Sequence, residues 1–127
     1  MFSTKLLLES PDVKAPDGSD VRVLLKLPGG SMAHFELAAG HVSRAIAHRT
    51  VDEIWYFVDG LGVMWRKFQG NVETVRVEAG VCITIPCGTE FQFRSLGPAP
   101  LKAVAVTMPP WPGDQEAYFV EGIWPAK

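Results

Sequence analysis

Glycine and proline divide this chain into short segments. Turn-forming residues recur roughly every ten positions, and the stretches between them are rich in β-branched and aromatic residues. No long helical period interrupts this pattern. Segments of this length suit strands better than helices, so the sequence predicts an all-β sandwich or barrel. The clearest turn pairs are Gly29-Gly30, Asp59-Gly60, Gly70-Asn71, Gly97-Pro98 and Pro109-Pro110.

The segments between the turns predict nine strands. We interpret residues 1–127 as a single domain with a barrel core at about 21–108. An N-terminal strand and an apolar C-terminal tail are expected to pack on this barrel or on a partner. The predicted strands are Val21–Leu27, Met32–Leu37, Arg44–His48, Glu53–Val58, Val63–Phe68, Val72–Val77, Val81–Ile85, Phe91–Ser95 and Leu101–Met108.

Composition excludes several classes of function. The formal net charge is −2 and no basic block occurs, which argues against nucleic acid as a partner. No apolar run approaches the length of a membrane span, and Leu6–Leu8 is too short for the core of a signal peptide. We therefore expect a cytoplasmic protein without membrane association. Cys82 and Cys87 match no zinc-binding spacing and are expected to be reduced thiols, with a disulfide or a reactive thiol as the alternative.

The most informative stretch runs from Gly40 to Gly60. Gly40 is followed by five residues, Ile46-Ala47-His48, four residues, Glu53, six residues and Gly60. This spacing resembles the first motif of the cupin superfamily, in which a glycine precedes a His-x-His pair, a glutamate and a second glycine. Ile46 occupies the position of the first histidine.

A second stretch resembles the other cupin motif. Gly80 is followed at the expected spacing by Pro86 and Gly88, but Phe91 stands at the histidine position and Ser95 at the asparagine position. The two motifs together cover Gly40 to Ser95. The resemblance implies an RmlC-like cupin fold, a double-stranded β-helix (jelly-roll) barrel of antiparallel sheets.

The resemblance also implies a metal site that is degenerate here. Cupins typically hold Fe, Mn, Ni or Zn with three histidines and a glutamate, and only His48 and Glu53 match those positions. Ile46 and Phe91 have no donor atom, and catalytic metal sites generally need three protein ligands. We expect no tightly bound cofactor, with a divalent metal as the minority interpretation. His34 and His41 are weak candidates for a substitute ligand.

Strand alternation predicts the barrel interior. If His48 points inward, Ile46 and Arg44 do so too. Likewise Trp55 and Phe57 point inward if Glu53 does, and Phe93 points inward if Phe91 does. The predicted cavity is an aromatic and aliphatic slot that binds a small polar or anionic ligand, with ionisable groups at one side. Each residue also has a structural interpretation: the ionisable groups as a buried polar cluster, the aromatic side chains as core, and Arg44 as a solvated rim residue.

Three functions fit these residues. The first is a metal-independent acid–base enzyme (an isomerase, epimerase or lyase), with His48 and Glu53 as catalytic residues. The second is a non-enzymatic ligand-binding or sensing cupin, and the third is a metallo-cupin such as a dioxygenase. The resemblance further implies a homodimer. Leu6–Leu8 and the aromatic tail both need cover, which is consistent with a dimer.

Overall fold

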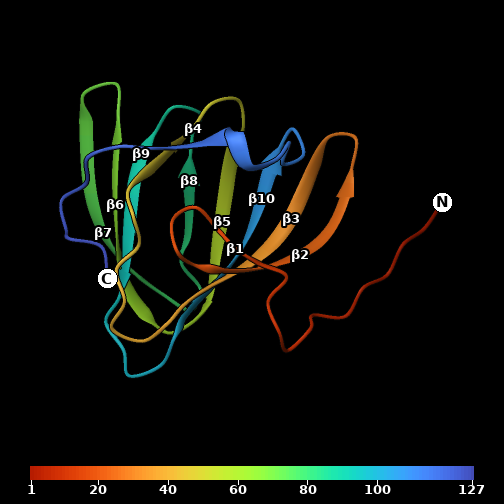
Figure 1. The fold of residues 1–127 in the computed structure, drawn as a ribbon, viewed down its shortest axis with the longest axis horizontal. Coiled ribbons are helices and arrows are strands. Elements are labelled where there is room, and N and C mark those ends of the chain that lie inside the picture. Colours follow the sequence, from red (N-terminus) through yellow and green to blue (C-terminus); the bar gives the residue numbers. More distant parts are fainter.

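Two antiparallel sheets face each other in the computed structural model, which describes residues 1–127 (Figure 1). The six-stranded sheet has the order β1-β2-β3-β10-β5-β8, and the five-stranded sheet has the order β11-β4-β9-β6-β7. The prediction of an all-β, antiparallel architecture is confirmed. The strands are β1 (Val13–Lys14), β2 (Asp20–Leu27), β3 (Gly30–Leu37), β4 (Ile46–His48), β5 (Asp52–Asp59), β6 (Leu61–Phe68), β7 (Asn71–Glu78), β8 (Cys82–Ile85), β9 (Glu90–Ser95), β10 (Leu101–Met108) and β11 (Ala117–Phe119).

All nine predicted strands exist, with ends that differ from the prediction by at most two residues, and the late start of β4 matters most for the site. It begins at Ile46 and not at Arg44. Arg44 leaves the ladder because its amide donates to the Asp17 carbonyl, whereas the Ser43 amide still donates to the Phe93 carbonyl of β9. The segment 43–44 therefore joins the loop before β2 to the five-stranded sheet.

The tail packs on its own barrel. Strand β11, which the sequence did not predict, pairs with β4, and a short 3-10 helix η1 (Asp114–Glu116) precedes it. Farther along, Val120 donates its amide hydrogen to the Ala45 carbonyl, and Lys127 and Val42 exchange two backbone hydrogen bonds. The C-terminal residues thus cover the open edge of the five-stranded sheet.

The core lies between the sheets and is built by period-two alternation. On β10, Leu101, Ala103 and Ala105 are buried, and the residues between them are half-buried. Trp55 of β5 stacks on Phe35 with ring centroids 4.9 Å apart and meets Phe93 edge-on at 5.3 Å. Offset and edge-to-face contacts of this kind fix the positions of the strands that carry the site.

The prediction of an N-terminal strand at Leu6–Leu8 is wrong: residues 1–8 form no strand, and the N-terminal arm, residues 1–10, is exposed along its whole length. It is tied to the edge of β2 by hydrogen bonds from Lys5 Nζ to the Val23 carbonyl (2.6 Å) and from Arg22 Nε to the Leu8 carbonyl (2.7 Å). Its first residues extend away from the barrel (Figure 1). No helix in the structure has the length and apolar character that crossing a membrane requires. Cys82 and Cys87 are free thiols.

Candidate functional site

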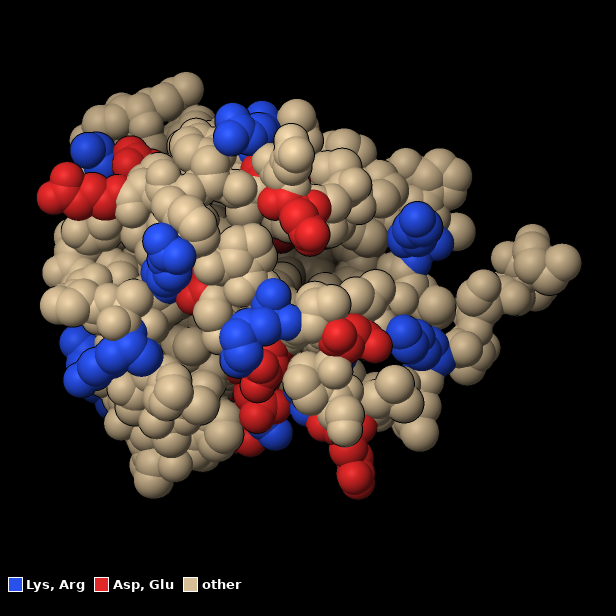
Figure 2. Space-filling model, in the orientation of Figure 1, with Lys and Arg blue, Asp and Glu red and all other residues tan.

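A cavity of about 720 Å³ opens at one end of the space between the sheets. Figure 2 shows a hollow near the middle of the face, with acidic and basic side chains around its rim. Of the 23 residues that line the cavity, 13 are hydrophobic. A mostly apolar cavity with a few polar groups is the usual form of a small-molecule site.

Five of the predicted site residues line this cavity, namely Ile46, His48, Glu53, Trp55 and Phe91. Two other predicted ligand-binding residues, Phe57 and Phe93, do not. Both are almost fully buried in the core, farther along β5 and β9 from the cavity. Their side chains point inward as predicted. They lie farther along their strands, where inward side chains fill the core and do not reach the cavity.

The prediction that Arg44 faces the interior is wrong. Arg44 is exposed, and its guanidinium lies 3.5 Å from the centroid of the Phe119 ring on β11. It does not line the cavity. The alternation argument failed because residues 43–44 are not part of β4, so they do not follow its period of two.

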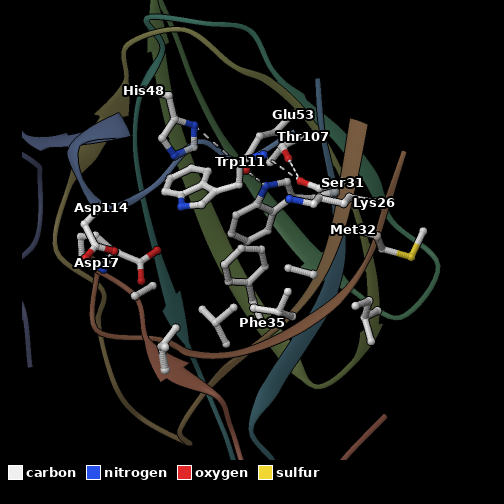
Figure 3. A pocket seen from close by; sticks show the side chains of 18 of the residues that line it. Asp17, Lys26, Ser31, Met32, Phe35, His48, Glu53, Thr107, Trp111 and Asp114 are labelled. Atoms are coloured by element: carbon white, nitrogen blue, oxygen red, sulfur yellow. Dashed lines mark hydrogen bonds and ion pairs between the residues drawn. The ribbon is translucent and has the colours of Figure 1, made fainter. Parts of the chain in front are cut away.

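His48 and Glu53 come together at the inner wall of the cavity (Figure 3). His48 Nδ1 lies 3.6 Å from Glu53 Oε1, and this oxygen accepts a hydrogen bond from Trp55 Nε1 at 2.9 Å. The gap of 3.6 Å is too long for a hydrogen bond. His48 Nδ1 and Glu53 Oε2 consequently have no hydrogen-bond partner, although both side chains are at least 95% buried. Unpaired buried polar atoms are costly, which makes these two atoms candidates for ligand contact.

Burial controls the protonation of both groups. It raises the pKa of Glu53 to about 8, and the hydrogen bond from Trp55 offsets this only in part. Burial also lowers the pKa of His48 to about 4. Near neutral pH the pair is thus a protonated carboxyl beside a neutral imidazole, and the 3.6 Å contact is not an ion pair. The carboxyl can donate a proton and the imidazole can accept one.

The structure adds cavity residues that the sequence analysis missed. Asp17, in the loop before β2, is 3% exposed, and its Oδ1 accepts hydrogen bonds from the Ser19 amide (2.9 Å) and hydroxyl (2.6 Å). Burial raises its pKa, and its charge adds to the raised pKa of Glu53. The Asp-Gly-Ser sequence is a turn signature that could have placed Asp17 in a tight loop, but not in the cavity.

Trp111 was also missed. It covers part of the cavity, with its ring edge-on to His48 at 5.2 Å between centroids. Its amide donates to the Ser31 hydroxyl at 2.9 Å, and this hydroxyl is also bonded to the Thr107 hydroxyl. The tail thus reaches over the open end of the barrel and fixes an aromatic side chain beside the acid–base pair (Figure 3).

The donor atoms present do not fit the four-ligand metal centre of cupins. Ile46 and Phe91, at two of the ligand positions, are paired directly across β4 and β9. His41 is exposed, and neither His41 nor the buried His34 lines the cavity. Nowhere do three His, Cys, Asp or Glu side chains converge as a ligand set. Only His48 and Glu53 remain at this place, fewer than a catalytic site needs.

Comparison with known proteins gives the same fold. The family described as "Cupin domain" matches residues 33–107. The uncharacterized protein MJ1618 of Methanocaldococcus jannaschii is 31% identical over 120 residues, which cover 87% of this chain and 93% of that protein.

Solved structures of similar proteins span nearly the whole chain. A variant of Streptomyces PAC13, solved with uridine, has a TM-score of 0.73 at 22% identity and covers 98% of this chain and 95% of that one. A protein with a double-stranded β-helix domain from Klebsiella pneumoniae has a TM-score of 0.70 at 17% identity and covers 94% of this chain and 100% of that one. The two sheets, the motif spacing and these matches together show that the chain belongs to the cupin family.

Proposed function

We propose that this cupin binds a small polar or anionic molecule and acts on it by acid–base chemistry, without a tightly held metal. The observation that carries the proposal is the pair of unpartnered, buried atoms, Glu53 Oε2 and His48 Nδ1, at the wall of the cavity. A buried acid and a buried base that lack partners in the protein are available to a ligand.

The chemistry follows from the protonation states. Glu53 donates a proton to an oxygen of the ligand, and the neutral His48 imidazole takes a proton from a neighbouring carbon or hydroxyl. One proton enters the ligand and one leaves it, as in an isomerisation, an epimerisation or an elimination. Burial keeps both groups uncharged until the ligand binds, and aromatic side chains on three sides exclude water.

A non-enzymatic ligand-binding role is the second candidate. The apolar side chains of Ile46 and Phe91 favour it, because they retain a cavity while removing the metal positions. The two roles differ in one measurable property, namely whether the bound molecule is converted.

A ligand screen followed by a turnover assay tests the proposal. We expect saturable binding of at least one small polar compound, with uridine included in the panel because the similar PAC13 was solved with it. For a compound that turns over, Glu53→Gln and His48→Ala are expected to lower kcat by about 10²- to 10⁴-fold. Glu78→Gln, at an exposed position on β7, is the control and should leave kcat unchanged.

Three outcomes separate the alternatives. Unchanged turnover in both site variants contradicts the acid–base assignment. Binding without turnover of any compound supports the sensing role. Activity that disappears after dialysis against a chelator, and returns with Fe, Mn, Ni or Zn, contradicts the metal-independent mechanism and supports a metallo-cupin.

We further propose a homodimer in which a second copy covers the outer face of the six-stranded sheet. Ile54, Tyr56 and Val58 on β5 are 41–47% exposed on that face. The N-terminal arm adds the exposed side chains of Phe2 and Leu6. Contiguous exposed apolar side chains of this kind commonly mark an interface. The predictions of a cytoplasmic location and of no nucleic-acid partner stay predictions.

Light scattering after size exclusion tests the dimer. The protein is expected to elute with twice the mass of one chain at micromolar concentration, and Tyr56→Glu is expected to give a monomer because it buries a charge in the interface. Val72→Glu, which places the same charge on an exposed β7 position, should leave the dimer intact. A monomeric wild-type protein contradicts the proposal.

A further inference from the structure

A β-bulge in β2 places Lys26 on the inner face of this strand, where Val23, Leu24 and Leu25 also line the cavity. Val23 is paired with Ala33, so an unbroken ladder would place Leu25 opposite Ser31. The register shifts after Val23, and Lys26 is the residue opposite Ser31. One extra residue reverses the face on which the following side chains lie, and bulges often redirect a side chain near a functional site.

The face occupied by Lys26 is the inner one. Its cross-strand partner Ser31 points into the barrel, where its hydroxyl is bonded to the Thr107 hydroxyl and accepts from the Trp111 amide at 2.9 Å. Lys26 and Ser31 both line the cavity. Figure 3 shows the Lys26 side chain extending from its strand toward the middle of the cavity, beside Ser31 and Thr107.

The Lys26 ammonium has no partner in the protein. It takes part in no ion pair and no hydrogen bond. Arg22 on the same strand differs, because its guanidinium forms an ion pair with Glu36 at 3.2 Å. Lys14 also lines the cavity, but its ammonium is held by Asp20 at 2.8 Å. Lys26 is thus the basic residue of the cavity lining whose charge is available to a ligand.

The charges of the cavity are separated in space. Figure 3 places Asp17 and Asp114 on the side opposite Lys26, with His48 and Glu53 at the inner wall. An anionic group would be repelled by the exposed Asp114 carboxylate and would pay the cost of desolvation near the apolar inner wall. Beside Lys26, which is exposed to solvent, it would gain attraction and keep part of its hydration.

We propose that Lys26 is the ligand-binding residue that selects molecules with a carboxylate or phosphate group, and that this group lies at the cavity mouth while a hydroxyl or carbonyl of the same molecule reaches His48 and Glu53. This inference rests on the proposed function and names its class of ligand. It gives Lys26 a place among the ionisable groups of the cavity, where the sequence analysis expected Arg44.

Matched pairs of probes test the inference by calorimetry at low salt. Each pair shares one scaffold and differs in charge: uridine and uridine 5′-monophosphate, glucose and glucose 6-phosphate, benzyl alcohol and benzoate. For at least one pair we expect the anionic member to bind about tenfold tighter than the neutral one, a typical size for one partly solvated charge contact. Lys26→Met should remove most of this preference and change the affinity for the neutral member less than about twofold.

Two further variants make the result specific. Lys26→Arg should retain the preference because it keeps the charge, and Lys14→Met should also retain it because Lys14 is already paired with Asp20. Thermal unfolding of each variant checks that it is folded. The preference should also weaken as salt is added.

The failures are distinguishable. Neutral members that bind as tightly as anionic ones, or a Lys26→Met protein that keeps the preference, overturn the inference and leave the proposed function standing. An equal loss of preference in Lys14→Met also overturns it, because it would reflect overall charge and not a contact. Absence of binding for every probe overturns the inference, and only failure of the wider ligand screen overturns the proposed function as well.

Discussion

Replacement of Gly60 by alanine is expected to destabilise the protein by more than about 3 kcal/mol, the largest effect that we predict for adding a single methyl group. Gly60 has φ +86°, where an L-residue is strained by about 1–2 kcal/mol. The added Cβ would also overlap the Pro100 carbonyl oxygen and lie only 2.7 Å from Leu101 Cα. Both obstacles are backbone atoms at the start of β10, so relief requires a shift of the main chain.

Gly80→Ala is the matched control. Gly80 has a similar φ of +97°, but an added Cβ there would meet nothing within 4 Å. We therefore expect only the backbone cost of about 1–2 kcal/mol in this variant. Urea unfolding of the wild-type protein and both variants measures the difference. Equal losses in the two variants would contradict the steric argument, because they would show that backbone strain alone accounts for Gly60.

These two glycines also show what the sequence could reveal about the fold. Both are motif positions that the sequence predicted to be turns, and the structure shows that both have positive φ. The turn pattern therefore located all nine main strands to within three residues. It could not reveal that Gly60 also touches Pro100, because that contact joins segments far apart in the sequence. The two-residue β1 and the tail strand β11 were not predicted because neither has a periodic pattern of its own.

The site was only partly predictable. Alternation placed Glu53 and Trp55 correctly because β5 is regular, and it failed for Arg44 because β4 begins two residues later. Lys26 was invisible because the bulge that directs it inward has no glycine to mark it. Asp17 and Trp111 lie in loops, where tertiary contacts and not local pattern decide the direction of a side chain.

Glu53→Gln is expected to change how stability depends on pH. The pKa of Glu53 is about 8 in the folded protein and near its ordinary value of 4.5 in the unfolded chain. Its raised pKa therefore stabilises the fold fully below pH 4.5, and this contribution is lost as pH rises toward 8, where the unfolded chain has released the proton and the folded protein still holds it. The whole loss is of the order of 5 kcal/mol. Glutamine should avoid it because its side chain does not ionise, and its amide oxygen can still accept from Trp55.

His48 limits the pH range in which this effect is visible. Its pKa is lowered to about 4, so its contribution to stability is present above pH 6.5 and is lost as pH falls toward 4. Between pH 4.5 and 6.5 the two groups oppose each other, and stability should change little on their account. Above pH 6.5 His48 is neutral in both states, and the effect of Glu53 should dominate the difference between wild type and Glu53→Gln.

Urea unfolding at pH 6.5 and pH 8 therefore tests the protonation of the site without any ligand. The free energy of unfolding of the wild-type protein should fall by about 2 kcal/mol more than that of Glu53→Gln over this interval. Across these 1.5 pH units the folded protein still holds the Glu53 proton that the unfolded chain has released. Asp17, whose pKa burial also raises, contributes a slope of the same sign to both proteins, and only its coupling to Glu53 is lost in Glu53→Gln. Glu78→Gln should follow the wild-type protein. Parallel profiles for wild type and Glu53→Gln would show that Glu53 is ionised at neutral pH, and the carboxyl could then not serve as the proton donor that the mechanism requires.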